Sequence, residues 1–110
     1  MSTFSSDPEI VLVITTEGSS SKAEFLAKEL LNRKLAACIT CRNVNSFFLW
    51  EGKINESNEI ELLIKSTKEK YKSLINSIYE LHSYKTPELI YLKTFSGFRY
   101  KEWIYKSTLE

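Results

Sequence analysis

Residues 10–31 read IVLVITTEGSSSKAEFLAKELL, and this stretch decides the fold. The aliphatic, mostly β-branched run at 10–14 has the composition and length of a strand. A glycine and three serines end it, and the apolar residues after them recur at helical spacing to about Lys34. Ser21 and Glu24 have the spacing of a capping box, which predicts where this helix begins. The stretch therefore predicts a strand followed by an amphipathic helix.

Downstream of this helix the same kinds of signal alternate again. Two extended segments form a hairpin, a second helix follows with apolar residues at i, i+3, i+4 and i+7, and a strand and a short helix come last. We expect extended segments at 35–41 and 47–50, turn residues at 51–53 and 55–58, a returning strand at 59–65, a helix capped by Ser66 or Thr67 that ends around His82, a strand at 88–95, and a final helix after Gly97.

The order of these elements predicts a ferredoxin-like α+β fold. It is β-α-β-β-α-β with an extra C-terminal helix, the arrangement of a split βαβ pair with an antiparallel sheet. Right-handed crossovers place both main helices on one face of that sheet. A length of 110 residues fits one domain. We expect residues 1–8 to form a flexible tail and residues 9–110 to form the single domain.

The predicted strands carry more apolar residues than one buried face of a sheet needs. The run at 10–14 is aliphatic at every position, and the segments 47–50 and 89–92 are apolar on both faces as well. A monomer with this fold would expose a polar face opposite its helices. Burying even five of these side chains is worth roughly 7–15 kcal/mol. We therefore expect other copies of the chain, with some help from the final helix, to cover the second face.

Composition and charge exclude several kinds of partner. The 15 Lys and Arg residues nearly balance 14 Asp and Glu residues, so the net charge is +1, too little for sequence-independent nucleic-acid binding. No apolar run approaches the ~20 residues that span a bilayer. The first seven residues lack the basic start and the apolar stretch of a secretory signal, and the chain has two cysteines. We therefore expect a cytoplasmic protein that binds neither nucleic acid nor membrane.

Cys38 and Cys41 have the C-x-x-C spacing of redox and zinc motifs. In a strand, residues three apart point to opposite faces and their Cα atoms lie roughly 10 Å apart, beyond disulfide reach. The sequence has no second cysteine pair or histidine cluster to complete a zinc site. We therefore expect both thiols to be small buried side chains, which leaves open that one thiol contributes to a site for a soft metal.

His82 is the only histidine, and it stands at the end of the second predicted helix, where the helix dipole favours its protonated form. One histidine cannot form a metal site within one subunit without help from a thiolate or a carboxylate, and in an oligomer it could meet residues of a neighbouring subunit. Glu59, Glu61 and Glu88 are candidate oxygen donors, although carboxylates at strand starts are more often simply solvated. Because the sequence has no glycine-rich phosphate loop, nucleophile elbow or Cys/His signature, we expect no enzymatic activity.

Five short motifs follow one another along the chain, namely LAAC at 35–38, WEGKI at 50–54, Glu59 with LLIK at 62–65, LHSYKTPE at 81–88, and Tyr100 with Trp103. In this order and spacing they resemble the CutA family of divalent-cation tolerance proteins. The resemblance implies a ferredoxin-like subunit in a tight homotrimer, similar in architecture to PII-type signalling proteins, with clefts between subunits. It also implies a role in the response to metal ions and weak copper binding, with no obligatory cofactor.

The resemblance also carries individual residues over by position. Cys38 matches the cysteine of the first motif, and it and His82 are the candidate ligands for Cu(II) or another divalent cation. Further motif residues are expected near the cleft between subunits, where they would bind a ligand. These cleft residues are Trp50, Lys65, His82, Tyr84 and Glu88.

Two positions depart from the Pro-Tyr-Glu that commonly follows the histidine in this family. Ser83 and Lys85 replace the proline and the glutamate. Losing a carboxylate and gaining an ammonium beside His82 weakens any cation site there. The alternative function is a PII-like trimeric sensor or scaffold, which would hold a partner protein or a small anionic ligand in the cleft between subunits. Lys65 and Lys85 would bind that anion.

Overall fold

A four-stranded antiparallel sheet, in the order β2-β3-β1-β4, forms one layer of the structure. The computed structural model describes residues 10–109, so the tail predicted at residues 1–8 lies outside the described residues. The elements are β1 (Ile10–Glu17), α1 (Ser20–Asn32), β2 (Cys38–Trp50), β3 (Lys53–Ser66), a 3₁₀ turn (Lys68–Lys70), α2 (Tyr71–Leu81), β4 (Ile90–Thr94) and α3 (Phe98–Ser107). This order confirms the predicted ferredoxin-like fold, and β4 occupies only the central part of the predicted range 88–95.

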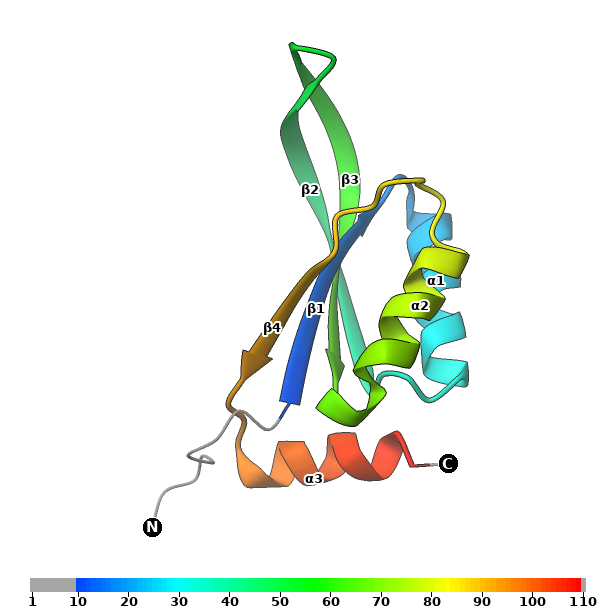
Figure 1. Ribbon diagram of the computed structural model, residues 1–110, viewed down its shortest axis with the longest axis vertical. Coiled ribbons are helices and arrows are strands. Elements are labelled where there is room, and N and C mark those ends of the chain that lie inside the picture. The colour runs from blue at the N-terminus through cyan, green and yellow to red at the C-terminus, as the bar shows by residue number, and fades with distance from the viewer. Residues whose placement is uncertain (1–9, 110) are drawn as a thin grey trace.

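Helices α1 and α2 lie side by side on one face of the sheet, as right-handed crossovers predict (Figure 1). Helix α3 runs across the lower end of the strands in the same view. The core between the sheet and the first two helices is aliphatic, and truncating one of its large side chains to alanine costs about 2–5 kcal/mol. Its fully buried members include Leu26 and Leu30 of α1, Leu62 and Ile64 of β3, and Leu74 and Ile78 of α2.

The cap of helix α1 lies two residues before the predicted position. Ser19 has an extended backbone, and its Oγ accepts a hydrogen bond from Lys22 N at 3.3 Å. The capping box predicted at Ser21 and Glu24 is therefore wrong. All three consecutive serines carry a hydroxyl that can cap a helix, so spacing alone does not distinguish them. The serine that still has an extended backbone after β1 takes the role.

The start of helix α2 also differs from the prediction. Ser66 is the last residue of β3, and its hydroxyl donates to the carbonyl oxygen of Leu35 at 2.6 Å, so it does not cap a helix. Thr67 precedes the 3₁₀ turn and makes no side-chain capping bond. The α-helix begins at Tyr71 and ends just before His82, which agrees with the predicted end.

Strands β2 and β3 form one hairpin that projects well beyond the helices (Figure 1). Their pairing is continuous from Cys38 opposite Lys65 to Trp50 opposite Lys53. The polar residues 55–58, predicted as turn residues, therefore belong to β3. Their backbone pairs with β2 without interruption. This part of the hairpin covers no core, so its strands can carry polar side chains.

Two residues make the whole turn of this hairpin. Glu51 and Gly52 both have positive φ angles, of 51° and 74°. A two-residue type I′ turn requires this combination, because its twist matches that of the flanking strands. Glycine adopts the left-handed conformation without strain, whereas the side chain of Glu51 makes it unfavourable there.

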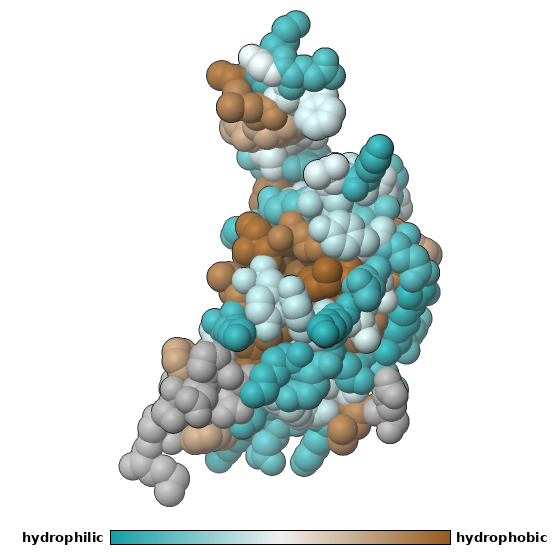
Figure 2. Space-filling view, in the orientation of Figure 1, coloured by the Kyte–Doolittle hydropathy of each residue, from teal (hydrophilic) through white to brown (hydrophobic). Residues whose placement is uncertain are grey.

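The face of the sheet opposite helices α1 and α2 carries aliphatic side chains from three strands. Their sequence neighbours, such as Val13 and Ile64, are fully buried against the helices, so strand alternation turns these side chains the other way. Ile90 and Leu92 are 45% and 46% exposed. Figure 2 shows apolar side chains in the middle of the view and at the hairpin tip. We call the face of the sheet opposite α1 and α2 the open face and define it by Leu12, Ile14, Leu63, Ile90 and Leu92.

Candidate functional site

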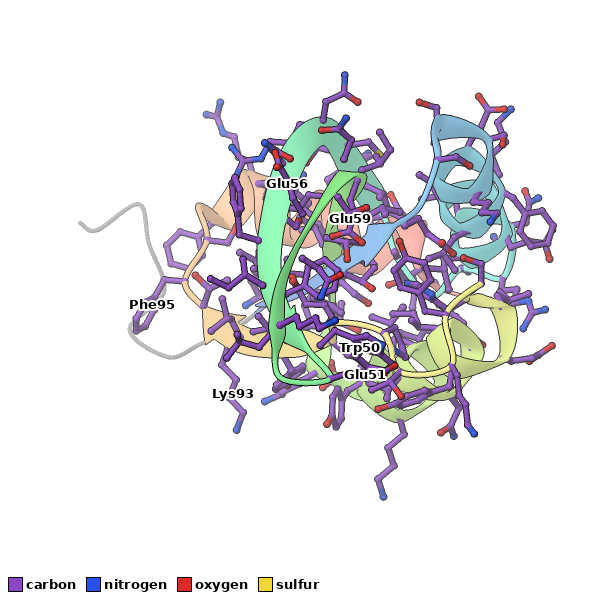
Figure 3. The ribbon with its side chains drawn as sticks, turned by 90° about the horizontal axis from the view of Figure 1, so that it is seen from above. Trp50, Glu51, Glu56, Glu59, Lys93 and Phe95 are labelled. Atoms are coloured by element: carbon purple, nitrogen blue, oxygen red, sulfur yellow. The ribbon has the colours of Figure 1, made fainter. Side chains whose placement is uncertain are left out.

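A cavity of about 800 Å³ lies between the β2–β3 hairpin and the loop that joins α2 to β4. Its aromatic lining consists of Phe47, Phe48 and Trp50 from the hairpin and Tyr84 from the loop. Figure 3 looks down on the hairpin and shows Trp50 over this loop. Of the predicted cleft residues, Trp50, Tyr84 and Glu88 line this one cavity, and His82 and Lys65 do not.

His82 lies directly behind the cavity wall, where it is buried. Its Nδ1 accepts a hydrogen bond from Tyr84 N at 2.9 Å, and its Nε2 lies 2.6 Å from the carbonyl oxygen of Thr16. A backbone N–H can only donate and a carbonyl can only accept, so Nε2 carries the proton and the ring is neutral. The protonated form predicted from the helix dipole is therefore wrong, because Nδ1 accepts from the loop backbone at Tyr84, and Nε2 holds the loop to β1.

Glu17, which the sequence did not indicate, anchors the same loop. Its side chain is almost completely buried, and Oε2 accepts a hydrogen bond from Ser83 N at 3.0 Å. Its Oε1 accepts from the Ser83 hydroxyl and from Gly18 N at 3.2 Å. The proline that the CutA resemblance leads one to expect in place of Ser83 would supply neither an N–H nor a hydroxyl. Ser83 therefore makes two hydrogen bonds to Glu17 that a proline could not make.

Tyr84 joins the loop to the hairpin. Its hydroxyl donates to Glu59 Oε2 at 2.8 Å, and its ring lies 5.1 Å from that of His82. Burial, the hydrogen bond to Glu59 and the nearby carboxylates raise the pKa of Tyr84 to about 12, so the phenol stays protonated and remains a donor. A Cβ at Gly18 would lie 3.1 Å from this hydroxyl, so the close approach of β1 and the loop favours glycine there.

Acidic groups gather along the upper part of the sheet. Burial and the neighbouring carboxylates of Glu61 and Glu59 raise the pKa of Glu88. Arg42 Nε donates to Glu61 Oε1 at 2.8 Å and compensates one of these charges. Glu59 and Glu88 line the cavity together with one ammonium group, that of Lys85.

Lys65 lies at the other end of β3. It is six residues from Glu59, which is roughly 20 Å along a strand. Its Nζ donates to Thr40 Oγ1 at 2.9 Å and lies 3.9 Å from Cys38 Sγ. The two predicted metal ligands are also apart, because Cys38 is level with Leu12 in the sheet whereas His82 binds Thr16, four residues further along β1.

Neither cysteine forms a disulfide, and the two side chains lie on opposite faces of β2, as the spacing predicted. The expectation that both are buried is wrong, because Cys41 is exposed and Cys38 is only half-buried. Strand β2 is at the edge of the sheet, which leaves its side chains less covered than those of β1 or β3. Within residues 10–109, no group of three or more His, Cys, Asp or Glu side chains is placed to hold a metal ion.

The fold and the cavity define a class of protein. It is a small α+β protein with a ferredoxin-like sandwich, a long projecting hairpin, and a ligand-sized cavity between that hairpin and the loop before the last strand. A family model described as CutA1 divalent ion tolerance protein matches residues 11–107. The chain belongs to the CutA1 divalent ion tolerance family, as the five motifs indicated.

Individual relatives agree with this assignment. Divalent-cation tolerance protein CutA from Archaeoglobus fulgidus is 36% identical over 93 residues, which are 84% of this chain and 91% of that protein. The protein of the same name from Yersinia pestis (strain Pestoides F) is 36% identical over 101 residues, covering 90% and 85%.

Solved structures match the fold over nearly the whole chain. CutA from Synechococcus elongatus PCC7942 superimposes with a TM-score of 0.93 at 27% identity, covering 98% of this chain and 97% of that one. The Archaeoglobus fulgidus structure, described as periplasmic, gives a TM-score of 0.88 at 33% identity, covering 91% and 99%. In the part of the chain described, no helix is both long and apolar enough to cross a membrane.

Proposed function

We propose that this chain assembles into a homotrimer through its open face and acts in the tolerance of divalent metal ions. In this role it catalyses no reaction, works in the cytoplasm and binds Cu(II) weakly. The names of its relatives support the connection with divalent cations. The observation that carries the assembly is the open face, where five aliphatic side chains stand opposite the helix-covered side of the sheet.

The strength of the assembly follows from the apolar area that it would bury. Fully burying an aliphatic side chain contributes about 1.5–3 kcal/mol. Ile90 and Leu92 are about half exposed in one subunit, so each would gain about half of that amount in each copy. A charge placed on the open face should therefore prevent association.

Multi-angle light scattering tests this proposal. The protein should have the mass of three chains, and Leu92→Glu should lower it. Tyr79→Glu is the matched control, because Tyr79 is an exposed residue on α2, away from the open face. A monomeric mass for the unmodified protein, or an intact trimer in Leu92→Glu, would reject assembly through this face.

Weak copper binding would depend on donors from more than one subunit. His82 has hydrogen-bond partners at both ring nitrogens, so it would have to release one of them to bind a metal. Cys38 points to the open face, where neighbouring copies would bring further donors, although the ammonium of Lys65 beside it disfavours a cation. Both features agree with a weak site rather than a strong one.

A Cu(II) titration of the assembled protein, followed by calorimetry, tests the two ligands. Cys38→Ser and His82→Ala should each weaken binding, whereas Cys41→Ser, on the opposite face of the same strand, should not. An affinity and stoichiometry that neither substitution changes would remove both residues from the site.

A second candidate function is a sensor or scaffold that holds a ligand between subunits, and the cavity beside the hairpin favours it. Of the two lysines predicted to bind an anion, only Lys85 lines this cavity. Thermal unfolding in the presence of small anionic metabolites tests the anion, because a ligand that binds only the folded state raises the melting temperature. No rise with any anion would reject it.

A further inference from the structure

The cavity beside the hairpin has an excess of negative charge. Glu59 and Glu88 line it against one ammonium, and among residues 10–109 no ion pair joins Lys85 to either carboxylate. A third carboxylate nearby, that of Glu61, is already paired with Arg42. Apart from Lys85, the loop adds no positive charge, because Tyr84 is a protonated phenol and the His82 ring behind it is neutral. A cation would therefore be attracted to this cavity and an anion repelled.

Aromatic side chains line the same space. Phe47 and Trp50 are 66% and 61% exposed, so their rings are accessible in the single chain, and Phe48 and Tyr84 complete the aromatic lining. The faces of aromatic rings attract cations, and this attraction grows when the cation carries little water. A strongly hydrated metal ion gains little there, because rings supply no oxygen ligands, and among residues 10–109 Glu59 and Glu88 belong to no group of three or more side chains placed to hold a metal ion.

We propose that this cavity binds an organic cation, an ammonium or guanidinium group on an apolar body. The apolar body contacts the aromatic lining, and the charged group lies near Glu59 and Glu88. A cavity of about 800 Å³ has the size of a small-molecule site. The proposal rests on the second candidate function in one respect, that the cavity takes a ligand. It replaces the anion by a cation, because Lys65 lies outside the cavity.

Three probes of nearly equal size separate charge from shape: 2-phenylethylammonium, the neutral 2-phenylethanol and the anionic phenylacetate. Binding is followed by the indole N–H signals in NMR spectra, where Trp50 reports on the cavity and Trp103, on α3 and outside it, is the internal reference. We expect the ammonium to shift the Trp50 signal and to bind about tenfold more tightly than the alcohol. Phenylacetate should leave both signals unchanged.

Two isosteric variants identify the carboxylates. Glu59→Gln and Glu88→Gln should each weaken binding of the ammonium about threefold to tenfold and leave the alcohol unaffected, since the amide oxygen at position 59 still accepts from Tyr84. Glu56→Gln is the matched control, because Glu56 is on the same strand but outside the cavity. Equal affinity for ammonium and alcohol, tighter binding of phenylacetate, or insensitivity to both variants would overturn the proposal.

Light scattering on the same samples separates this inference from the proposed assembly. A trimer that binds none of the three probes would overturn the organic-cation site and leave the assembly standing. A monomer that binds the ammonium as expected would support the site and reject the assembly.

Discussion

Replacing Ser83 by alanine removes a hydroxyl that donates to the buried carboxylate of Glu17. A hydrogen bond to a charged group is worth about 1.5–3 kcal/mol. Ser83 is itself exposed, so water can replace part of the lost bond, and the lower end of this range applies. We therefore expect Ser83→Ala to lower the free energy of unfolding by about 1.5 kcal/mol.

Replacing Ser83 by proline removes the backbone N–H as well, which donates to Glu17 at 3.0 Å. His82, which precedes it, already has the extended backbone that a following proline favours, with φ of −69° and ψ of 143°. The loss should therefore report the two hydrogen bonds rather than a steric conflict at His82. We expect about 3 kcal/mol, twice the effect of the alanine variant.

Urea unfolding followed by circular dichroism measures both variants. The protein concentration is kept fixed, because association makes the midpoint depend on it. Ser73→Ala, at an exposed position on α2, is the matched control and should stay within about 0.5 kcal/mol of the unmodified protein. If Ser83→Ala equals this control, or if the proline costs no more than the alanine, Glu17 is not the anchor of the loop.

Three further changes test other contacts. Gly18→Ala places a Cβ 3.1 Å from the Tyr84 hydroxyl, so the hydrogen bond from Tyr84 to Glu59 should lengthen, with an altered Tyr84 ring signal in NMR spectra and a stability loss of about 1 kcal/mol. Burial and nearby carboxylates raise the pKa of Glu88 in the folded state. The folded protein therefore loses stability as the pH rises from the unfolded-state pKa to the folded-state pKa of this group. Glu88→Gln removes this loss, so it should raise the melting temperature at neutral pH but not in acid. Glu51→Asn creates the pair preferred in type I′ turns and should stabilise the protein by about 0.5 kcal/mol in urea unfolding.

The periodicity of apolar residues was sufficient to predict the fold. The aliphatic run of β1 and the helical spacing in α1 and α2 are local signals, and right-handed crossovers leave few ways to join them. The open face was predictable for the same reason, since a strand that is apolar at every position must place apolar side chains on both faces. Periodicity failed at residues 55–58, because this part of β3 lies outside the core and its polar residues resemble those of a turn.

The site was only partly predictable because its contacts join distant parts of the chain. Trp50, Tyr84 and Glu88 were found through motifs and do line the cavity. Glu17 was missed because its hydrogen bonds reach Ser83, 66 positions away, and no local pattern indicates them. His82 was misjudged for a different reason, since its charge state is set by the hydrogen bond that Nδ1 accepts from Tyr84 N and not by the helix that it ends.

The projecting hairpin has a consequence for how the protein opens. Beyond the helices, β2 and β3 are held by their own ladder and by few other contacts, so their amide hydrogens should exchange with solvent through local fraying rather than global unfolding. Amides of β1, paired on both sides, should exchange only when the whole subunit unfolds. Any chain that packs against the hairpin slows the exchange of these hairpin amides first. Deuterium uptake at the hairpin tip therefore reports association residue by residue.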